Sequence, residues 1–350
     1  MAIDRQSTWM LYGAYGRTGR LILDEALRRG HRPVLAGRDA AQLAGLAQET
    51  GLRTEHLPLE HGDALRAALS RVGSVLLAAG PYRQTGPAMR AACLDAGCSY
   101  LDVNAEIDDF AAALECNERA RAAGIAVIPG VGYGVVFAEC LAARVATRLP
   151  TATWLRLSLA TRTAGRSRAA TLSTAAGMAG GGRDIHRGAL RRRPIAFATW
   201  RAPRGDANAM RFAAAPLAEL VAARRSTGVP DIVAGIPMSR AAAAVMRAGG
   251  PAIGRVLQWQ AARARRTKEP ALPDPTTSMR SRVWAEAGDD SGAYVAARLE
   301  TGEGYRAAAA AAVFAIARQL QQRRAGAFTP VQAFGPEFAG LIPGTRIEEL

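Results

Sequence analysis

Three glycines near the start of the chain have the spacing of a phosphate-binding turn. Gly13, Gly16 and Gly19 form a G-x-x-G-x-x-G pattern, a relative of the more common G-x-G-x-x-G pattern. A short apolar run at 8–12 precedes the turn, and an amphipathic segment at 17–29 follows it. Glycines at these positions let the chain turn sharply and let backbone N–H groups approach an anion. The pattern predicts a strand, a turn and a helix whose N-terminus holds phosphate groups, although an ordinary tight turn could use the same glycines.

Alternating strand and helix patterns continue to residue 129 and favour the dinucleotide-binding interpretation of the turn. The strands are expected at 8–12, 33–36, 53–57, 74–79, 99–103 and 125–128, and the helices at 17–29, 39–49, 62–71, 84–96 and 106–123. Alternation with short connections predicts right-handed βαβ units and a parallel sheet covered on both faces. The sequence therefore predicts an α/β fold whose first domain, 1–130, is a Rossmann-type doubly wound parallel sheet.

The residue after the second strand predicts which dinucleotide binds. In such a domain this residue faces the adenosine ribose, where a carboxylate selects NAD(H). Arg38 stands there instead, and a guanidinium can bind a 2′-phosphate through two charge-assisted hydrogen bonds. We therefore expect NADP(H), with Arg17 as a second cation and Asp39 as a helix N-cap. The alternative for Arg38 is a solvent-facing residue that starts the second helix.

The residues expected to contact the cofactor lie on the glycine turn and at the ends of the second and fourth strands. They are Gly13, Tyr15, Gly16, Arg17, Thr18, Gly19, Arg38, Ala79, Gly80 and Pro81. The last two would let the chain pass beside the nicotinamide ribose.

Residues that could touch a substrate follow the fourth, fifth and sixth strands, because ligands lie beyond the carboxyl ends of parallel strands. The candidates are Tyr82, Asp102, Glu106 and Tyr133, the last in a glycine-rich stretch at 129–134. Asp102 or Glu106 could act as general acid or base, or position the nicotinamide amide. Glu106 could equally complement a helix dipole in a first turn. Tyr133 could donate a proton or form a wall of the pocket.

The rhythm changes after Pro129 and predicts a second, α+β domain at 131–304 with a mostly antiparallel sheet. Its strands are expected at 152–162, 194–202, 207–214, 281–288 and 292–301, and residues 289–292 have the composition of a hairpin turn. We expect the substrate to lie between the two domains and the sheet to be available for a homodimer.

Three further segments complete the predicted organisation. An alanine-rich helix at 305–323 and the tail to residue 350 are expected to pack back on the first domain. Gly177 to Gly188 and a Gly-, Pro- and Arg-rich insertion at 249–280 are expected to be mobile. Two apolar-faced segments, 237–248 and 253–265, are expected to be separate helices.

The composition excludes several classes of protein. The formal charge of +15 could indicate a nucleic-acid or anionic membrane surface. However, nearly all the basic residues are scattered arginines, so we expect neither partner. Lys268 is the only lysine, so no residue before it can form a lysine Schiff base.

The cysteines and the apolar runs point to an intracellular protein. The four cysteines form no C-x-x-C pair and accompany no histidine cluster, so we expect reduced thiols, no disulfide and no metal. No apolar run approaches the roughly 20 residues that span a bilayer, and no leader pattern precedes the first strand. We therefore expect a cytoplasmic protein.

The chain resembles the bacterial saccharopine dehydrogenase-like NADP-binding reductases, including those called trans-acting enoyl reductases. The matching stretches are 12–19, 35–39, 80–82, 100–106 and 129–133, with weaker matches at 167–171, 226–230 and 301–305. The resemblance implies a two-domain NADP(H) oxidoreductase. It does not fix the substrate, because members of the family or their relatives act on imines, secondary amines and enoyl groups. The family commonly carries an Asp and then a Pro where this chain has Gly134 and Phe137, and a glycine where it has Ala170. If that Asp binds substrate in the relatives, the departure implies that this chain has a different substrate or lacks the usual reaction.

The sequence as a whole predicts an NADPH-dependent reductase. Hydride would pass to a polarised C=C or C=N bond of a small or medium apolar substrate. The alternative is a sensor or scaffold that binds NADP(H) without turnover.

Overall fold

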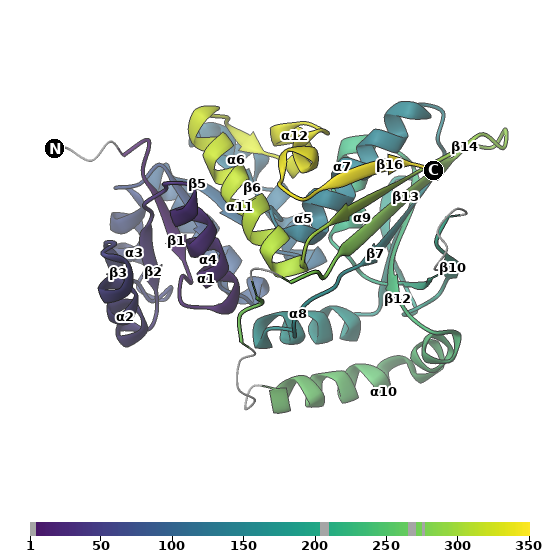
Figure 1. Ribbon diagram of the computed structural model, residues 1–350, viewed down its shortest axis with the longest axis horizontal. Helices are drawn as coiled ribbons and strands as arrows, with labels where there is room; N and C mark the ends of the chain where they lie inside the picture. The colour runs from purple at the N-terminus through teal and green to yellow at the C-terminus, as the bar shows by residue number, and fades with distance from the viewer. Residues whose placement is uncertain (1–4, 204–209, 265–270, 275–276) are drawn as a thin grey trace. The chain divides into compact units, whose positions relative to one another are not determined.

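The structure, a computed structural model, describes residues 5–203, 210–264, 271–274 and 277–350 and contains two units (Figure 1). Unit 1 comprises Met1–Asn104, Asp108–Tyr133 and Tyr305–Phe334. Unit 2 comprises Ala105–Ile107, Gly134–Gly304 and Gly335–Leu350. The chain therefore returns to unit 1 after residue 304, as far as Phe334. The expectation that the tail to residue 350 also packs there is wrong, because residues 335–350 belong to unit 2.

Unit 1 contains a seven-stranded parallel sheet in the order β15-β6-β5-β4-β1-β2-β3. The strands are β1 Trp9–Tyr12, β2 Val34–Gly37, β3 Thr54–His56, β4 Ser74–Leu77, β5 Ser99–Asp102, β6 Ala126–Ile128 and β15 Gly326–Ala327. β1 and β4 are buried along their whole length, as expected of strands covered on both faces. The strand order reverses between β1 and β4, which places the topological switch point there. The predicted Rossmann-type sheet is confirmed, and β15 is an additional strand at its edge.

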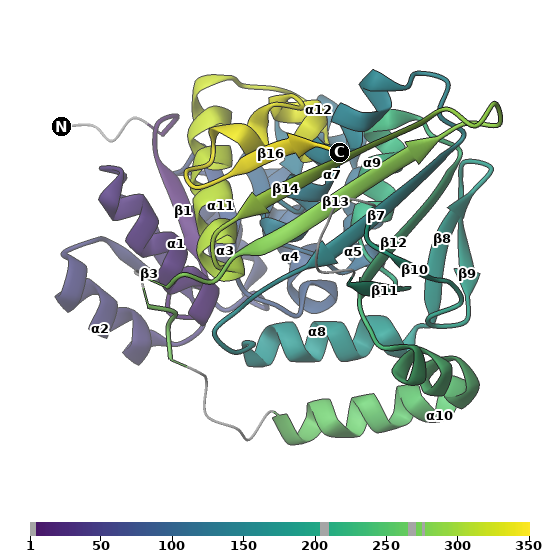
Figure 2. The same ribbon diagram turned by 45° about the vertical axis from the view of Figure 1, so that its right-hand side comes forward.

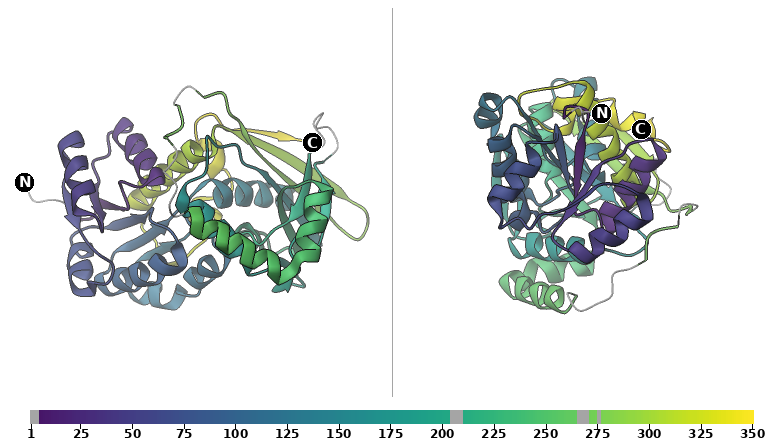
Figure 3. Two further views of the ribbon diagram at one scale, coloured as in Figure 1. Left: turned by 90° about the horizontal axis from the view of Figure 1, so that it is seen from below. Right: turned by 90° about the vertical axis from the view of Figure 1, so that its left-hand side faces the viewer.

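Helices cover both faces of this sheet, as the right-hand view of Figure 3 shows. They are α1 Arg17–Arg28, α2 Ala40–Thr50, α3 Gly62–Leu69, α4 Tyr82–Ala96, α5 Ile107–Leu114, α6 Asn117–Ala122, α11 Gly304–Gln321 and α12 Pro330–Phe334. The single helix predicted at 106–123 is divided into α5 and α6. At this break the Asn117 side chain accepts a hydrogen bond from the Ala327 N–H, 3.1 Å away, which fixes β15.

Unit 2 is built on a mixed sheet in the order β10-β11-β12-β7-β13-β14-β16, with β8 and β9 attached to β12. The strands are β7 Trp154–Ala160, β8 Gly182–His186, β9 Ala189–Arg193, β10 Thr199–Arg201, β11 Arg211–Ala214, β12 Asp231–Pro237, β13 Ser281–Gly288, β14 Tyr294–Thr301 and β16 Arg346–Glu349. Among the described ladders of this second sheet, only the β12–β7 pair is parallel. The mostly antiparallel sheet and the hairpin turn between β13 and β14 are confirmed.

Several strands of unit 2 were not predicted. The segment Gly177 to Gly188, which was expected to be mobile, contains β8, and β8 forms a hairpin with β9 beside β12 (Figure 2). The chain end pairs with β14 through β16, which is why the tail belongs to unit 2. Residues 207–209 of the strand predicted at 207–214 lie outside the described residues.

The helices of unit 2 are α7 Tyr133–Arg148, α8 Arg168–Ala179, α9 Glu219–Thr227 and α10 Arg240–Ala264, followed by a short 3₁₀ helix at Phe338–Leu341. The two helices predicted at 237–248 and 253–265 are one continuous helix, α10. It lies beside α8 (Figures 1 and 2), and a Cβ on Gly254 would lie 3.3 Å from the Ala179 Cα. The rest of the predicted insertion includes 265–270 and 275–276, which lie outside the described residues.

No helix within the described ranges is both long and apolar enough to cross a bilayer.

Candidate functional site

The glycine turn of unit 1 has no room for side chains at two of its three glycines. Gly13 has a φ of +85°, and a Cβ on it would lie 2.8 Å from the Ala79 Cβ at the end of β4. A Cβ on Gly19 would lie 2.1 Å from the Gly13 carbonyl oxygen. The Gly13 N–H also donates to the Ala36 carbonyl of β2 at 2.8 Å. The turn is therefore held tightly at the switch point between β1 and β4.

The start of α1 is shaped to receive an anion. Gly16 is the N-cap with extended backbone, and it has no side chain to cap the N–H groups of the first helical turn. The Gly16 N–H donates to the Gly13 carbonyl at 3.0 Å, which closes the turn. Orphan N–H groups and the positive end of the helix dipole together attract phosphate. Thr18 in the first turn is half-buried.

Tyr15 connects the glycine turn to the end of β2. Its hydroxyl accepts a hydrogen bond from the Arg38 N–H at 3.1 Å. Its ring covers Gly37, where an added Cβ would lie 2.5 Å from the ring. Arg38 itself is exposed, and Asp39 accepts a hydrogen bond from the Gln42 N–H, which confirms the predicted N-cap. The guanidinium at the tip of β2 therefore reaches solvent.

Arg17 does not lie where it was expected. Its side chain is inside unit 1, with the residue 5% exposed, and its guanidinium lies 4.9 Å from the centre of the Tyr305 ring at the start of α11. Such a contact stabilises a buried cation. The structure therefore corrects the expectation of a second exposed cation beside Arg38 and gives Arg17 a role in attaching α11 to α1.

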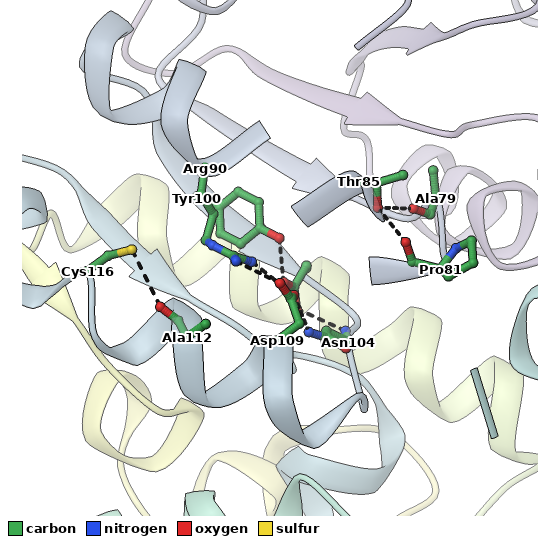
Figure 4. Close-up of polar contacts among 10 residues, drawn as sticks. Ala79, Pro81, Thr85, Arg90, Tyr100, Asn104, Asp109, Ala112 and Cys116 are labelled. Carbon is green, nitrogen blue, oxygen red and sulfur yellow. Dashed lines mark hydrogen bonds and ion pairs between the residues drawn. The ribbon is translucent and has the colours of Figure 1, made fainter. Parts of the chain in front are cut away.

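The end of β4 forms the other wall of the turn. The peptide bond between Gly80 and Pro81 is cis, and Pro81 is the N-cap of α4. The Thr85 hydroxyl donates to the Ala79 carbonyl at 2.6 Å, with the Pro81 carbonyl 3.3 Å away (Figure 4). Thr85 was not predicted as a site residue. Its contacts fix the stretch Ala79–Pro81, whose three residues were predicted to contact the cofactor. Tyr82 begins α4 and is largely buried.

Asp102 is a positioning residue rather than an acid that a substrate can reach. It is 0% exposed. Its Oδ1 accepts from the N–H groups of Gly130 at 2.7 Å and Asn104 at 2.9 Å, and its Oδ2 accepts from the Tyr100 hydroxyl at 2.5 Å. These bonds hold the stretch after β6 against the end of β5. The structure thereby corrects the expectation that Asp102 is a general acid or base, because three donors occupy its carboxylate.

A buried ion pair lies next to the hydrogen bonds of Asp102, at the carboxyl end of β5. Arg90 of α4 forms a two-pronged ion pair with Asp109 of α5, at 2.9 and 2.7 Å (Figure 4). The Asn104 amide donates to Asp109 at 2.8 Å, and the Asn104 N–H donates to Asp102. The network therefore joins α4, α5 and the end of β5. The sequence analysis did not find Arg90, Asp109 or Asn104.

The raised pKa of Asp102 predicts a pH dependence of stability. Burial raises this pKa to about 6, compared with about 3.9 in an unfolded chain. The folded state therefore binds the proton more tightly. The contribution to stability is fully present below about pH 4 and is lost as the pH rises through 6, by roughly 3 kcal/mol.

Asp102→Asn should remove that dependence, because an amide can still accept from Gly130 and can donate to Tyr100. We expect the free energy of unfolding of the variant, relative to the wild-type protein, to increase between pH 4 and pH 7. Denaturant unfolding of both proteins across this range measures the difference. A difference that does not change with pH would contradict the buried titration.

The remaining candidates are divided between the units. Tyr82 and Tyr133 belong to unit 1, and Tyr133 begins α7 with little exposure. Glu106 belongs to unit 2, where it accepts a hydrogen bond from the Ser173 hydroxyl of α8 at 2.5 Å. The sequence analysis missed Glu219, a buried carboxylate of unit 2. The available signal was its position as the only charged residue within the apolar run 212–223.

Comparison with known proteins finds one matching family model and several relatives that match part of the chain. Residues 9–128 match the model of the saccharopine dehydrogenase NADP binding domain. The trans-acting enoyl reductase of Mycobacterium tuberculosis is 34% identical over 111 residues, which cover 30% of this chain and 27% of that protein. A probable mitochondrial saccharopine dehydrogenase-like oxidoreductase of Arabidopsis thaliana is 29% identical over 149 residues, 37% of this chain and 32% of that protein. The chain thus matches about a third or less of the length of these relatives.

A solved structure extends the similarity of fold beyond that segment. The saccharopine dehydrogenase (L-Glu forming) of Saccharomyces cerevisiae aligns with a TM-score of 0.62 and 11% identity, over 98% of this chain and 99% of that one. This similarity confirms the fold, and together with the matched domain it confirms the resemblance predicted from the sequence.

Proposed function

We propose that this chain, whose first unit is similar to the NADP binding domain of saccharopine dehydrogenase, is an NADPH-dependent oxidoreductase. It would transfer hydride to a polarised C=C or C=N bond of a small or medium apolar substrate. The observation that carries the proposal is the glycine turn, where an added Cβ on Gly19 would strike the Gly13 carbonyl at 2.1 Å. A turn this tight, followed by a helix without an N-cap side chain, is suited to a diphosphate.

The residues present fit NADP(H). The diphosphate would lie at Gly13–Gly19, the 2′-phosphate at the exposed Arg38, and the nicotinamide ribose beside Ala79–Pro81. Tyr15 would support the adenosine end, because its hydroxyl already holds the Arg38 N–H. NADPH supplies a hydride when bound, and the protein contributes binding and orientation.

The names of the relatives leave two bond types open. One relative is called a trans-acting enoyl reductase, and another is called a saccharopine dehydrogenase-like oxidoreductase. These names support reduction of a C=C bond in the first case and chemistry at a C–N bond in the second. We therefore propose both classes as substrates to be tested.

A sensor or scaffold that binds NADP(H) without turnover is the second candidate. It is favoured by Gly134, which stands where the family commonly carries an Asp. Mixing the protein and NADPH with a panel of 2-enals and cyclic imines distinguishes the two. Loss of the NADPH absorbance band supports the oxidoreductase, whereas cofactor binding without any loss supports the sensor.

Arg38→Ala is expected to remove the preference for NADPH over NADH. One charge-assisted contact contributes about 1.5–3 kcal/mol, so the Kd for NADPH should increase by about 10- to 100-fold. The Kd for NADH should stay the same, because NADH carries no 2′-phosphate. Calorimetric titration with both cofactors measures the change.

Arg32→Ala is the matched control, because Arg32 is an exposed arginine at the opposite end of β2. It should bind both cofactors as the wild-type protein does. Equal affinity of the wild-type protein for NADPH and NADH would remove the argument for Arg38.

A further inference from the structure

The three most exposed large apolar side chains of the described residues all lie on α10 of unit 2. Val245, Trp259 and Val256 are 64%, 59% and 51% exposed. Single apolar side chains are common on protein surfaces, but a group of them on one element marks an interaction site. The long helix therefore presents an apolar surface on which a partner can bind.

α10 has two arms, because it contains a glycine pair followed by Pro251, which lacks an N–H and bends a helix. The left view of Figure 3 shows the bend. In the first arm, Ala243 is buried in a cluster that includes Met178 of α8. Residues two apart in a helix lie about 200° apart around its axis. Val245 therefore points away from this cluster, as its exposure shows.

The second arm has the same arrangement. Its inward face packs on α8, where a Cβ on Gly254 would lie 3.3 Å from the Ala179 Cα. Val256 and Trp259 lie about 200° and 140° from Gly254 around the helix axis, so they face outward. The exposed Arg263 guanidinium lies 4.6 Å from the centre of the Trp259 ring. The outward face of this arm therefore combines apolar side chains with a cation.

The charge of this part of the chain has one sign. Between Asp231 and Glu269 the sequence contains six arginines, one lysine and no acidic residue. The arginines include Arg240, Arg247 and Arg263, which are exposed. The neighbouring helix α8 has no acidic residue either (Figures 1 and 2). An anionic partner is therefore complementary to this surface.

The carboxylates of unit 2 do not neutralise these arginines. Among the described side chains, no carboxylate forms an ion pair with an arginine of α10. The pKa of Arg211 is lowered by desolvation and then by the neighbouring charges of Arg240 and Arg201, so three guanidinium groups lie near one another. The Glu106 carboxylate reaches α8, where it accepts a hydrogen bond from the Ser173 hydroxyl. The positive charge of α10 is thus available to a partner.

We propose that α10 binds the surface of an anionic lipid bilayer, a function separate from the proposed reduction. Val256 and Trp259 enter the boundary between headgroups and acyl chains, about 5–10 Å deep, and the arginines attract the lipid phosphates. The long side chain of Arg263 keeps its charge among the headgroups. The helix lies flat on the bilayer, because both of its arms contain arginines.

This proposal departs from the expectation, based on the scattered arginines of the sequence, that the chain has no membrane partner. The fold places exposed apolar side chains and unpaired arginines on one helix, which the sequence did not show. A nucleic acid would bind the arginines but has no apolar phase for Val245, Val256 and Trp259. A second copy of this chain would cover the apolar side chains but would bring the same positive charge to the contact.

Sedimentation of the whole chain with lipid vesicles tests the proposal. Its affinity for vesicles of phosphatidylglycerol and phosphatidylcholine in equal parts should be at least about 10-fold higher than for phosphatidylcholine alone. Raising the NaCl concentration should weaken the binding, because salt screens exposed charges. Phosphatidylcholine brominated in its acyl chains should quench tryptophan fluorescence in the mixed vesicles, because Trp259 reaches the acyl boundary.

Val256→Ala combined with Trp259→Ala removes the apolar part of the surface and keeps the charge. The affinity for the anionic vesicles should fall about 10- to 100-fold, and the quenching should be lost. Leu190→Ala combined with Leu341→Ala is the matched control, because it removes two exposed apolar side chains elsewhere on unit 2. This control should bind the vesicles as the wild-type protein does.

Arg263→Glu reverses one charge on α10, and Arg192→Glu makes the same change in net charge on β9, where Arg192 is exposed. The first variant should lower the affinity for anionic vesicles about 10-fold, and the second should lower it much less. Thermal unfolding and the Kd for NADPH should stay at the wild-type values in every variant, which shows that each one folds.

Three results would overturn this inference. The wild-type protein could bind neither kind of vesicle, or both equally. The variant without Val256 and Trp259 could keep its affinity, which would show that net charge alone attracts the lipid. Light scattering could reveal a wild-type dimer that this variant converts to a monomer, which would show that a second copy covers α10. None of these results bears on the oxidoreductase, which the NADPH measurements test separately.

Discussion

Gly19→Ala is expected to abolish NADPH binding and to lower the free energy of unfolding by about 3 kcal/mol or more. The added Cβ would lie 2.1 Å from the Gly13 carbonyl oxygen and 2.9 Å from the Ala14 Cα. Both are backbone atoms, so relief requires α1 to move away from the turn. That movement would separate the N-terminus of α1 from the phosphate position. Calorimetric titration with NADPH and urea unfolding measure the two effects.

Gly45→Ala is the control for this variant, because it makes the same change in a neighbouring helix. Gly45 lies within α2, and nothing lies within 4 Å of its added Cβ. Alanine there should increase stability by up to about 1 kcal/mol through helix propensity and leave NADPH binding unchanged. Wild-type affinity in Gly19→Ala would show that the turn does not hold the diphosphate.

Most of the parallel sheet of unit 1 could be predicted because all of its strands except β15 carry a local signal. β1, β2, β4 and β6 are short apolar runs bounded by turn residues, and their burial on both faces follows from that composition. β15 has only two residues, Gly326 and Ala327, and no pattern. Its pairing with β6 depends on Asn117, which is distant in sequence. Local patterns therefore predict the sheet but not its added edge.

The strands that were missed in unit 2 owe their positions to distant contacts. β12 contains Gly235 and ends at Pro237, residues that disfavour a strand prediction. The structure requires that glycine, because an added Cβ would lie 2.5 Å from the Trp200 ring of β10. The β8–β9 hairpin is rich in arginine, and its Asp184–Arg191 pair across the ladder compensates for the missing apolar pattern.

In the candidate site too, some residues could be predicted from local sequence patterns, and others depend on contacts that are distant in sequence. Glycine spacing alone indicated Gly13 and Gly19, because each needs its backbone geometry locally. Asp102 was also recognised as a carboxylate at the end of a strand. Two of its hydrogen-bond donors, Tyr100 and Asn104, are local, but the third is the N–H of Gly130 after β6. Its role in joining β5 to that later segment could therefore not be read from sequence. Glu219 lies 85 residues after Gly134 in the chain, and only the fold brings its carboxylate to the point that a Cβ on Gly134 would occupy.

Asp109→Ala is expected to lower the free energy of unfolding by about 3–5 kcal/mol, because it leaves the Arg90 guanidinium buried without its counter-ion. The side chains of the pair are 5% and 4% exposed. Gly86 permits the approach, since an added Cβ there would lie 2.6 Å from Arg90 Nη1 and 2.7 Å from Asp109 Oδ2. Denaturant unfolding measures the loss.

Two comparisons separate the cost of an uncompensated charge from the value of the pair. Arg90→Met combined with Asp109→Leu removes both charges and should be less destabilising than Asp109→Ala alone, because apolar residues can replace a buried ion pair. Asp63→Ala breaks the exposed pair with Arg66 on α3 and should cost less than about 1 kcal/mol. If the double variant were as unstable as the single one, the loss would come from packing, and the buried charge would not be its cause. The expected order follows from desolvation, since water solvates Arg66 after its partner is removed and cannot reach Arg90.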